Sequence, residues 1–450
     1  MFNVYLGACS IYDSQQIADV IQTGLDAIQF NQSISGHVVI KPNLVMAHPA
    51  VATEGYTRPA VVDALLGLLR RDHPQIRKLD IVEKSGLGIT TSAMFKTAGY
   101  HKLKQKHGVR LRAMEAIAKV NVPLHNAQVH DTVTVAREMA ERDVLIFMPK
   151  LKSNVLSHGL SGALKLNIGT LDGRERLHRH HYDLPHKIAD MLEIANPDLI
   201  VTDGIRMAYG GNQMTQHGTH LGVIVMADNA VAHDLVCARL LNLNPAGIEH
   251  IQEAARRGYG PATLNEVRIV GDYPVKKAQS ITAGLDLGFR PVDQVESPMT
   301  VHSGAPYCTA GCHGIFLDWI YMIKDRKPKL FAKLPALNVI VGKVEKDLQS
   351  GRFVLIGDCA KTSRLPVRGR KVWIRGCPPS HKRIVWDMMV HYLIFNPLVR
   401  PSLIVDAYIR YPLNKLKSFW LNAIWYRHIR NTGTRYAHHK TAELDQSGNR

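Results

Sequence analysis

The chain has 450 residues, 46% of them hydrophobic and 21% charged, a composition that excludes wholesale disorder and predicts two or three domains. No apolar run approaches the roughly 18 residues of a membrane-spanning helix. The first residues, MFNVYLGACSIYDS, lack the basic start of a secretory signal. Six cysteines are too few for a disulfide framework, so we expect a reducing, cytoplasmic compartment.

Residues 1–272 alternate short apolar runs with helix-length stretches such as 58–71 and 229–241. The runs predict strands at VYLGA, HVVIKPN, LDIVEKS, DVLIFMPK, DLIVTDG, LGVIVMA and VRIVG. This alternation predicts an α/β fold whose sheet is mainly parallel and has flanking helices. In such folds ligands usually bind at the carboxyl ends of the strands.

The rest of the chain predicts a linker over residues 273–300, a smaller α/β domain over 301–430 and a disordered tail over 431–450. Strand-then-loop units are expected at FAKLPALNVIVGKV, RFVLIGDCA and RKVWIRGCPPS, followed by helices broken at Pro397, Pro401 and Pro412. Residues 273–450 contain 28 Lys and Arg against 12 Asp and Glu, whereas residues 1–272 contain 28 against 26. This asymmetry predicts a basic module that meets an acidic partner.

Basic and amide side chains follow the predicted strands in the first domain. They are Lys41 and Asn43 in IKPN, Lys150 and Lys152 in MPKLK, and Lys165 and Asn167 in GALKLNIG. If these segments meet at one rim of a parallel sheet, they form a cationic, amide-rich pocket for a carboxylate or a phosphate. The alternative is that the lysines simply face water.

Four residues are candidates for proton transfer. His178 and His181 in LHRHHYD are three residues apart and would share a helical face, and the nearby Arg174, Arg176 and Arg179 favour an anionic substrate over a metal ion. Asp203 ends a predicted strand, where acid–base carboxylates are common, and Asp234 follows His233. The alternatives are a solvated basic loop for the histidines and turn or helix-capping roles for the carboxylates.

Four of the six cysteines lie in Gly- or Pro-containing loops of the C-terminal part. They are Cys308 and Cys312 in YCTAGCHG, Cys359 in LIGDCAK and Cys377 in RGCPPS. Four convergent thiolates bind an iron–sulfur cluster or zinc. Structural zinc sites commonly have two closely spaced cysteine pairs, whereas this chain has one, and this favours a [4Fe–4S] cluster. The alternative is four unrelated reduced thiols; Cys9 and Cys237 are expected to be small core residues.

Two resemblances add to this interpretation. VIKPN, DVLIFMPKLK, SGALKLNIG, VTDG, AHD and the later GYG, in this order over residues 1–272, resemble the uncharacterised family known as domain of unknown function 362. That family is often joined to ferredoxin-like modules, and its fold is distantly similar to the N-terminal half of nickel-pincer lactate racemases. The family usually has a histidine soon after PKLK, where this chain has Asn154 and only later His158.

The second resemblance covers only about 70 residues. Cys359-Ala360 after a strand, followed by Gly376-Cys377-Pro378-Pro379, resembles the four-iron cluster region of the B-type subunit of respiratory complex I and of the small subunit of nickel–iron hydrogenases. The resemblance implies that Cys308, Cys312, Cys359 and Cys377 are cluster ligands. The spacing of Cys308 and Cys312 is one residue longer than in the hydrogenase CTGC motif.

Residues 408–430, YIRYPLNKLKSFWLNAIWYRHIR, interleave aromatic and basic side chains. Three interpretations remain open: a helix on an anionic membrane surface, which would make the protein peripheral at the inner membrane face; a nucleic-acid-binding stripe; and a helix whose aromatics pack on the domain. A basic surface near a cluster would also attract an acidic electron-transfer protein.

The leading functional hypothesis is an iron–sulfur oxidoreductase. It would couple a [4Fe–4S] cluster to a small anionic substrate held in the first domain. The alternatives are a zinc- or cluster-stabilised binding protein for nucleic acid or anionic membrane, and a non-redox, isomerase-like enzyme with a structural cluster.

Overall fold

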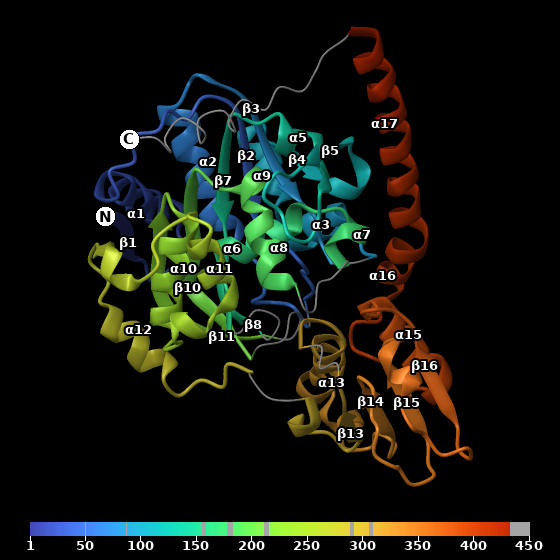
Figure 1. Ribbon diagram of the computed structural model, residues 1–450. Helices are drawn as coiled ribbons and strands as arrows, with labels where there is room; N and C mark the ends of the chain where they lie inside the picture. Colours follow the sequence, from blue (N-terminus) through green and yellow to red (C-terminus); the bar gives the residue numbers. More distant parts are fainter. Residues whose placement is uncertain are drawn as a thin grey trace.

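In the residues that it describes, the computed structural model contains a ten-stranded sheet, a four-stranded sheet further along the chain and a two-stranded hairpin (Figure 1). It describes residues 1–49, 51–86, 88–154, 159–177, 183–210, 216–288, 292–305 and 309–432. The expected tail over 431–450 lies almost entirely outside these residues.

The large sheet confirms the predicted α/β class. Its main path contains, in spatial order, β12 (Val267–Val270), β1 (Phe2–Ala8), β11 (His217–Ala227), β10 (Leu199–Tyr209), β7 (Val144–Met148), β2 (Gly36–Pro42), β3 (Ile76–Glu83) and β4 (Arg110–Ala113). Beside β10 lies the short strand β8 (Lys150–Asn154), which pairs with β9 (Gly159–Ser161). The pairs from β10 through β4 are parallel, whereas β11 runs antiparallel to both of its neighbours.

Helices cover both faces of this sheet, which explains why strands such as β2 and β7 are buried along their whole length. The longer ones are α1 (Ser14–Ala27), α2 (Pro59–Asp72), α3 (Thr91–Ala98), α4 (His101–His107), α10 (Ala230–Leu240), α11 (Glu249–Arg256) and α12 (Val275–Thr282). Shorter ones are α5 (Arg137–Ala140), α6 (Ala163–Leu166), α7 (Gly173–Leu177), α8 (Leu184–Asp190) and α9 (Leu192–Ala195), and a hairpin is formed by β5 (Lys119–Pro123) and β6 (Thr132–Ala136). Helix α12, inside the segment expected to be a linker, is hydrogen-bonded to the end of α10 through Thr282 and the Leu240 carbonyl.

The second sheet has four parallel strands in chain order. They are β13 (Thr300–Ser303), β14 (Asn338–Val341), β15 (Phe353–Ile356) and β16 (Lys371–Ile374), and they are accompanied by α13 (Gly314–Arg326), α14 (Pro328–Phe331) and α15 (His381–Tyr392). Helix α13 contacts the large sheet, since Asp325 lies 3.5 Å from His217 at the start of β11.

The end of the chain returns to the first domain. Helix α16 (Pro401–Val405) continues through a π-helical turn into α17 (Tyr411–Thr432), so Pro412 lies in the first turn of α17 and does not break the helix. Figure 1 shows α17 running along one side of the molecule. The Asp406 carboxylate accepts hydrogen bonds from the Thr90 amide and hydroxyl, and Asn422 accepts one from the Lys119 amide. Among the described helices, none is both long enough and apolar enough to cross a bilayer.

Candidate functional site

A cavity of about 50 Å³ lies where the carboxyl ends of β2 and β3 meet the β8–β9 hairpin and α6. This volume is room for a few waters or a small anion. It is lined by Lys41, Asn43, Val45, Glu83, Lys152, Asn154, Ser161, Lys165, Leu166, Ile168, Gly169 and Arg176. The structure therefore brings together Lys41, Asn43, Lys152 and Lys165 from the predicted pocket, whereas Lys150 and Asn167 are not among its lining residues.

Lys41 is the basic group of the cavity that has a carboxylate partner. Its Nζ lies 2.9 Å from the Glu83 Oε1 and donates to the Pro42 carbonyl at 3.2 Å. Burial lowers the pKa of Lys41, and the adjacent Glu83 opposes this effect. Glu83 also accepts the amides of Leu44 and Lys84, so its charge is held in place by the backbone after β2 and β3.

Lys152 and Lys165 differ from Lys41 because no carboxylate of the described residues lies within salt-bridge distance of either ammonium group. Burial lowers the pKa of Lys152 to about 8. Burial also lowers the pKa of Lys165 well below its ordinary value, and the nearby charges of Lys152 and Arg176 lower it further. Lys152 is buried and Lys165 is half-buried, and a desolvated charge without a counter-ion is costly, so these two side chains favour an anionic ligand between them.

Arg176 adds a fourth positive group from α7. Its guanidinium donates to the Lys84 and Ser85 carbonyls at 2.8 and 3.3 Å, which fixes its position at the end of β3. The Lys187 ammonium in turn donates to the Arg176 carbonyl at 3.1 Å. Burial lowers the pKa of Arg176, as expected for a cation held inside the protein.

The pKa of Lys152 leads to a prediction for anion binding. We expect the affinity for sulfate, whose charge is constant above neutral pH, to fall as pH rises through about 8, where Lys152 loses its proton. The expected fall is up to about tenfold for each pH unit. Calorimetric titration with sulfate at several pH values measures it.

Unfolding would not explain this loss. The pKa of Lys152 is lower in the folded protein than its ordinary value of 10.5, so between these values the unfolded chain binds more protons. This group therefore makes the ligand-free protein more stable as pH rises through that window. A sulfate affinity that does not change between pH 7 and 10 would contradict the assignment of Lys152 to the anion site.

Asp234 occupies a buried capping position rather than the cavity wall. Its carboxylate accepts the Ala163 and Leu164 amides at 2.7 and 3.1 Å and lies 2.7 Å from the His233 Nδ1. The His233 Nε2 lies 2.7 Å from the Thr202 hydroxyl. Asp234 thus holds the start of α6, the helix that carries Lys165, and its role in proton transfer stays a prediction.

The close approach at Gly162 makes this cap testable. A Cβ at Gly162 would lie 2.2 Å from the Asp234 Oδ1, so Gly162→Ala should displace the carboxylate. We expect a loss of about 1–3 kcal/mol in the free energy of unfolding, measured by urea denaturation. Gly67→Ala is the matched control: nothing lies within 4 Å of its added methyl, in the exposed middle of α2. It should gain about 0.5–1 kcal/mol. Equal effects of the two substitutions would contradict the cap.

Asp203 and Lys150 form a buried pair on adjacent strands. The Lys150 Nζ lies 2.9 Å from the Asp203 Oδ2, which also accepts the Arg58 amide, and the Tyr12 hydroxyl donates to the other carboxylate oxygen at 2.8 Å. Burial and the charge of Asp203 raise the pKa of Tyr12. These contacts engage both carboxylate oxygens of Asp203, and its catalytic role stays a prediction.

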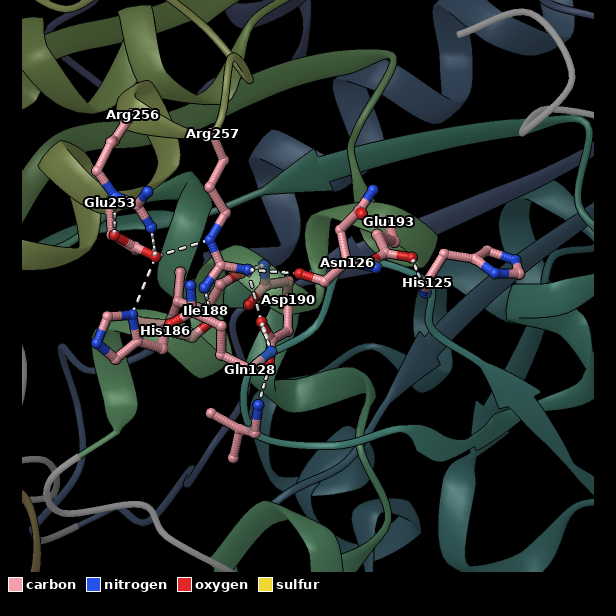
Figure 2. Close-up of polar contacts among 12 residues, drawn as sticks. His125, Asn126, Gln128, His186, Ile188, Asp190, Glu193, Glu253, Arg256 and Arg257 are labelled. Atoms are coloured by element: carbon pink, nitrogen blue, oxygen red, sulfur yellow. Dashed lines mark hydrogen bonds and ion pairs between the residues drawn. The ribbon is translucent and has the colours of Figure 1, made fainter. Parts of the chain in front are cut away.

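Asn167 does not line the cavity but binds a segment next to it. Its side-chain amide donates to the Ile188 carbonyl at 2.9 Å. Figure 2 shows Ile188 inside a polar network centred on Arg257, whose guanidinium lies between Asp190 and Glu253. Asp190 also accepts the Gln128 and Val129 amides. This network fixes α8 against α11, and so fixes the segment before Gly169, which lies against Lys41.

The remaining candidates for proton transfer, His178 and His181, lie outside the described residues, so their roles stay predictions. The sequence analysis did not identify Glu83, Asn154 or Ser161 as site residues. Glu83 lies near the end of the predicted strand LDIVEKS, just as Lys41 lies near the end of its own predicted strand. Glu83 could therefore have been identified from the tendency of ligands to bind at the carboxyl ends of strands.

Cys312, Cys359 and Cys377 lie at the carboxyl end of the second sheet, and Cys308 lies outside the described residues. A Cβ at Gly357, which has φ +90°, would lie 2.5 Å from the Cys312 Sγ and 3.5 Å from the Gly376 carbonyl. The loops of Cys359 and Cys377 are joined by hydrogen bonds between Asp358 and Gly376. In the part of the chain that the structure describes, no group of three or more His, Cys, Asp or Glu side chains could hold a metal ion. Cys9 and Cys237 are buried, as expected of core residues.

The fold and the cavity define an α/β protein with a buried cationic site. Residues 38–239 match the model of the family described as Domain of unknown function (DUF362), so this part of the chain is a DUF362 domain. The match contains the cavity residues. No curated protein matches the chain.

Two solved structures are similar to the chain. The lactate racemase apoprotein from Thermoanaerobacterium thermosaccharolyticum is 10% identical, with a TM-score of 0.33 over 75% of this chain and 69% of that one. A protein from Thermotoga maritima is 14% identical, with a TM-score of 0.33 over 74% of this chain and 71% of that one. Neither likeness bears on activity.

Proposed function

We propose that this protein is an iron–sulfur oxidoreductase that acts on a small anionic substrate in the cavity of the DUF362 domain. One observation carries the proposal. Helix α13 starts directly after the turn that contains Cys312, and the charge of its buried Asp318 acts on Lys152 and Lys165. Cys312 and Asp318 are six residues apart along the chain, less than two helical turns, which supports a predicted cluster site close to the cavity.

The cavity supports an anionic substrate through its charge balance. Lys41, Lys152, Lys165 and Arg176 line it together with a single carboxylate, Glu83. Asn43, Asn154 and Ser161 add neutral groups that can hydrogen-bond to the uncharged oxygens of an organic acid. Lys152, with a pKa near 8, is suited to exchange a proton with the bound substrate at neutral pH.

The second sheet supports the cluster through its cysteine loops. Cys312 packs against the Gly357 turn, and that turn is hydrogen-bonded to the loop of Cys377. Both turns contain glycines with positive φ, which keeps side-chain bulk away from the space between the loops. A [4Fe–4S] cluster bound by these thiolates and Cys308 would supply one-electron transfer.

Anaerobic purification with quantification of iron, acid-labile sulfide and zinc tests the proposal. We expect about four iron and four sulfide per chain and a broad absorption band near about 400 nm that bleaches with dithionite. Small carboxylates can then be screened for reoxidation of the reduced protein. Zinc without sulfide would overturn the redox proposal and favour the binding protein with a structural metal.

A non-redox enzyme is the second candidate, and the proximity of Lys152 and Lys165 favours it. Two neighbouring lysines with lowered pKa values, one buried and one half-buried, can act as an acid and a base on one substrate. Substrate turnover that continues unchanged after the cluster is removed would select this candidate.

A further inference from the structure

One face of helix α17 packs on the protein, and the opposite face, which is apolar, is exposed. Tyr411 and Ser418 are buried against the first domain, and Trp425 packs against its core. The Ser418 hydroxyl donates to the Ile117 carbonyl, and Tyr411 accepts a hydrogen bond from Lys84. These contacts lie on the inner face of the helix and hold α17 against the first domain.

The outer face carries large apolar side chains that are exposed. Leu413, Leu416, Trp420 and Ile424 recur at intervals of three and four residues and are 57–66% exposed, and Phe419 beside them is 67% exposed. At 3.6 residues per turn they lie opposite Tyr411 and Ser418. Single exposed apolar residues need no explanation, but a continuous row along a helix marks an interaction site.

The apolar row continues onto the preceding helices. The ring of Trp386 on α15 lies 5.8 Å from that of Tyr408, one turn before α17. Of the exposed large hydrophobic residues in the described chain, all but Met1, Ile11 and Val367 lie between residues 386 and 426. We call this region the C-terminal apolar surface; its further members are Val390, Leu393, Phe395, Ile404, Val405, Ile409 and Tyr426.

Positive charge accompanies this surface. Residues 411–432 contain Lys415, Lys417, Arg427 and Arg430 and no acidic residue, and Arg410 directly precedes them. The carboxylate of Asp406 is buried against Thr90 and does not offset this charge. Lys417 and Arg410 fall beside the outer row on the helix, since they follow it by about 60° in rotation.

We propose that the C-terminal apolar surface binds an anionic lipid bilayer, with α17 lying in the plane of the interface. Aromatic and aliphatic side chains enter the acyl region while the flanking Lys and Arg contact lipid phosphates. Nucleic acid fits less well because Leu413, Leu416 and Ile424 would gain no apolar environment there. A second copy of the chain fits less well because a symmetric contact would bring two basic helices together.

Co-sedimentation of the full chain with vesicles tests this proposal. We expect binding to phosphatidylcholine vesicles that contain about one third phosphatidylglycerol, little binding to pure phosphatidylcholine, and weakening by added salt. The double variant Phe419→Ser/Trp420→Ser should lower the partition coefficient by about tenfold or more. Val367→Ser, at a residue that is 96% exposed outside the surface, is the matched control and should leave binding unchanged.

Three results would overturn the proposal. They are equal vesicle binding by the double variant and the control, binding to duplex DNA without binding to vesicles, and a dimer in lipid-free solution that the double variant dissociates. Circular dichroism of each variant confirms that the fold is retained, which both exposed substitutions should allow.

Discussion

Lys165→Met should weaken anion binding strongly while leaving the ligand-free protein at least as stable as before. The substitution removes a half-buried basic group that has no carboxylate partner among the described residues and whose pKa is lowered by desolvation and by the charges of Lys152 and Arg176, so the free energy of unfolding should rise by about 1 kcal/mol. The same substitution removes one of the ammonium groups that would contact the anion. We therefore expect the affinity for sulfate to fall about a hundredfold. Urea denaturation and calorimetric titration measure the two effects independently.

Lys150→Met is the matched control, because it changes a buried lysine to the same residue close to the cavity. It would leave Asp203 without its 2.9 Å partner, and we expect a loss of about 3–5 kcal/mol in stability. A lysine that merely supports the fold behaves like Lys150. If Lys165→Met were equally destabilising and still bound sulfate normally, Lys165 would be structural and the anion site would lie elsewhere.

Cys377→Ala should remove the cluster. Because a thiolate ligand cannot be replaced by a methyl group, we expect the iron and sulfide content and the absorption near about 400 nm to be lost. The DUF362 domain should remain folded, and sulfate binding in its cavity should be unchanged. Iron analysis together with calorimetric titration of the same preparation tests both statements.

Cys9→Ala controls for the loss of a thiol as such, since Cys9 is buried in the first domain. It should keep full iron content. Unchanged iron in Cys377→Ala would remove Cys377 from the ligand set. That result would not affect the evidence for the anion site. The experiment therefore distinguishes failure of the proposed cluster site from failure of the proposed anion site.

The strands could be predicted because burial dominates their sequence. Runs such as HVVIKPN and DVLIFMPK are apolar on both faces, which is typical of parallel strands covered by helices on both sides. The antiparallel position of β11 could not be predicted, because its run LGVIVMA has the same apolar character as its parallel neighbours. Direction in a sheet depends on the connections, which apolar patterning does not record.

The residues of the candidate site that follow predicted strands could be identified from the sequence. Lys41, Asn43 and Lys152 follow this rule, but Lys150, two residues from Lys152, turned out to be the partner of Asp203. The reason is a register shift between β8 and β10: Lys150 pairs with Asp203, whereas Lys152 pairs with Ala208. Alternation of side chains along an ideal strand would have placed both lysines on one face.

The C-terminal helix illustrates a different limit. Its aromatic and basic residues were compatible with packing, membrane binding and nucleic-acid binding. The structure shows that packing uses only the face of Tyr411, Ser418 and Trp425. The packed side carries polar Ser418 and Asn422, whereas the exposed side is the more apolar one, so apolar patterning could not show which side faces the protein.

The hydrogen bonds from this helix to the first domain have a consequence for biosynthesis. They connect Thr90 with Asp406, Lys84 with Tyr411 and Lys119 with Asn422, partners that are separated by 303–327 residues. While the ribosome is still making the second half of the chain, the buried Lys84 and Thr90 lack these partners. The DUF362 domain therefore emerges incomplete and can complete this part of its surface only after residues 406–422 have been made, which leaves buried polar groups of the nascent chain exposed for a long stretch of synthesis.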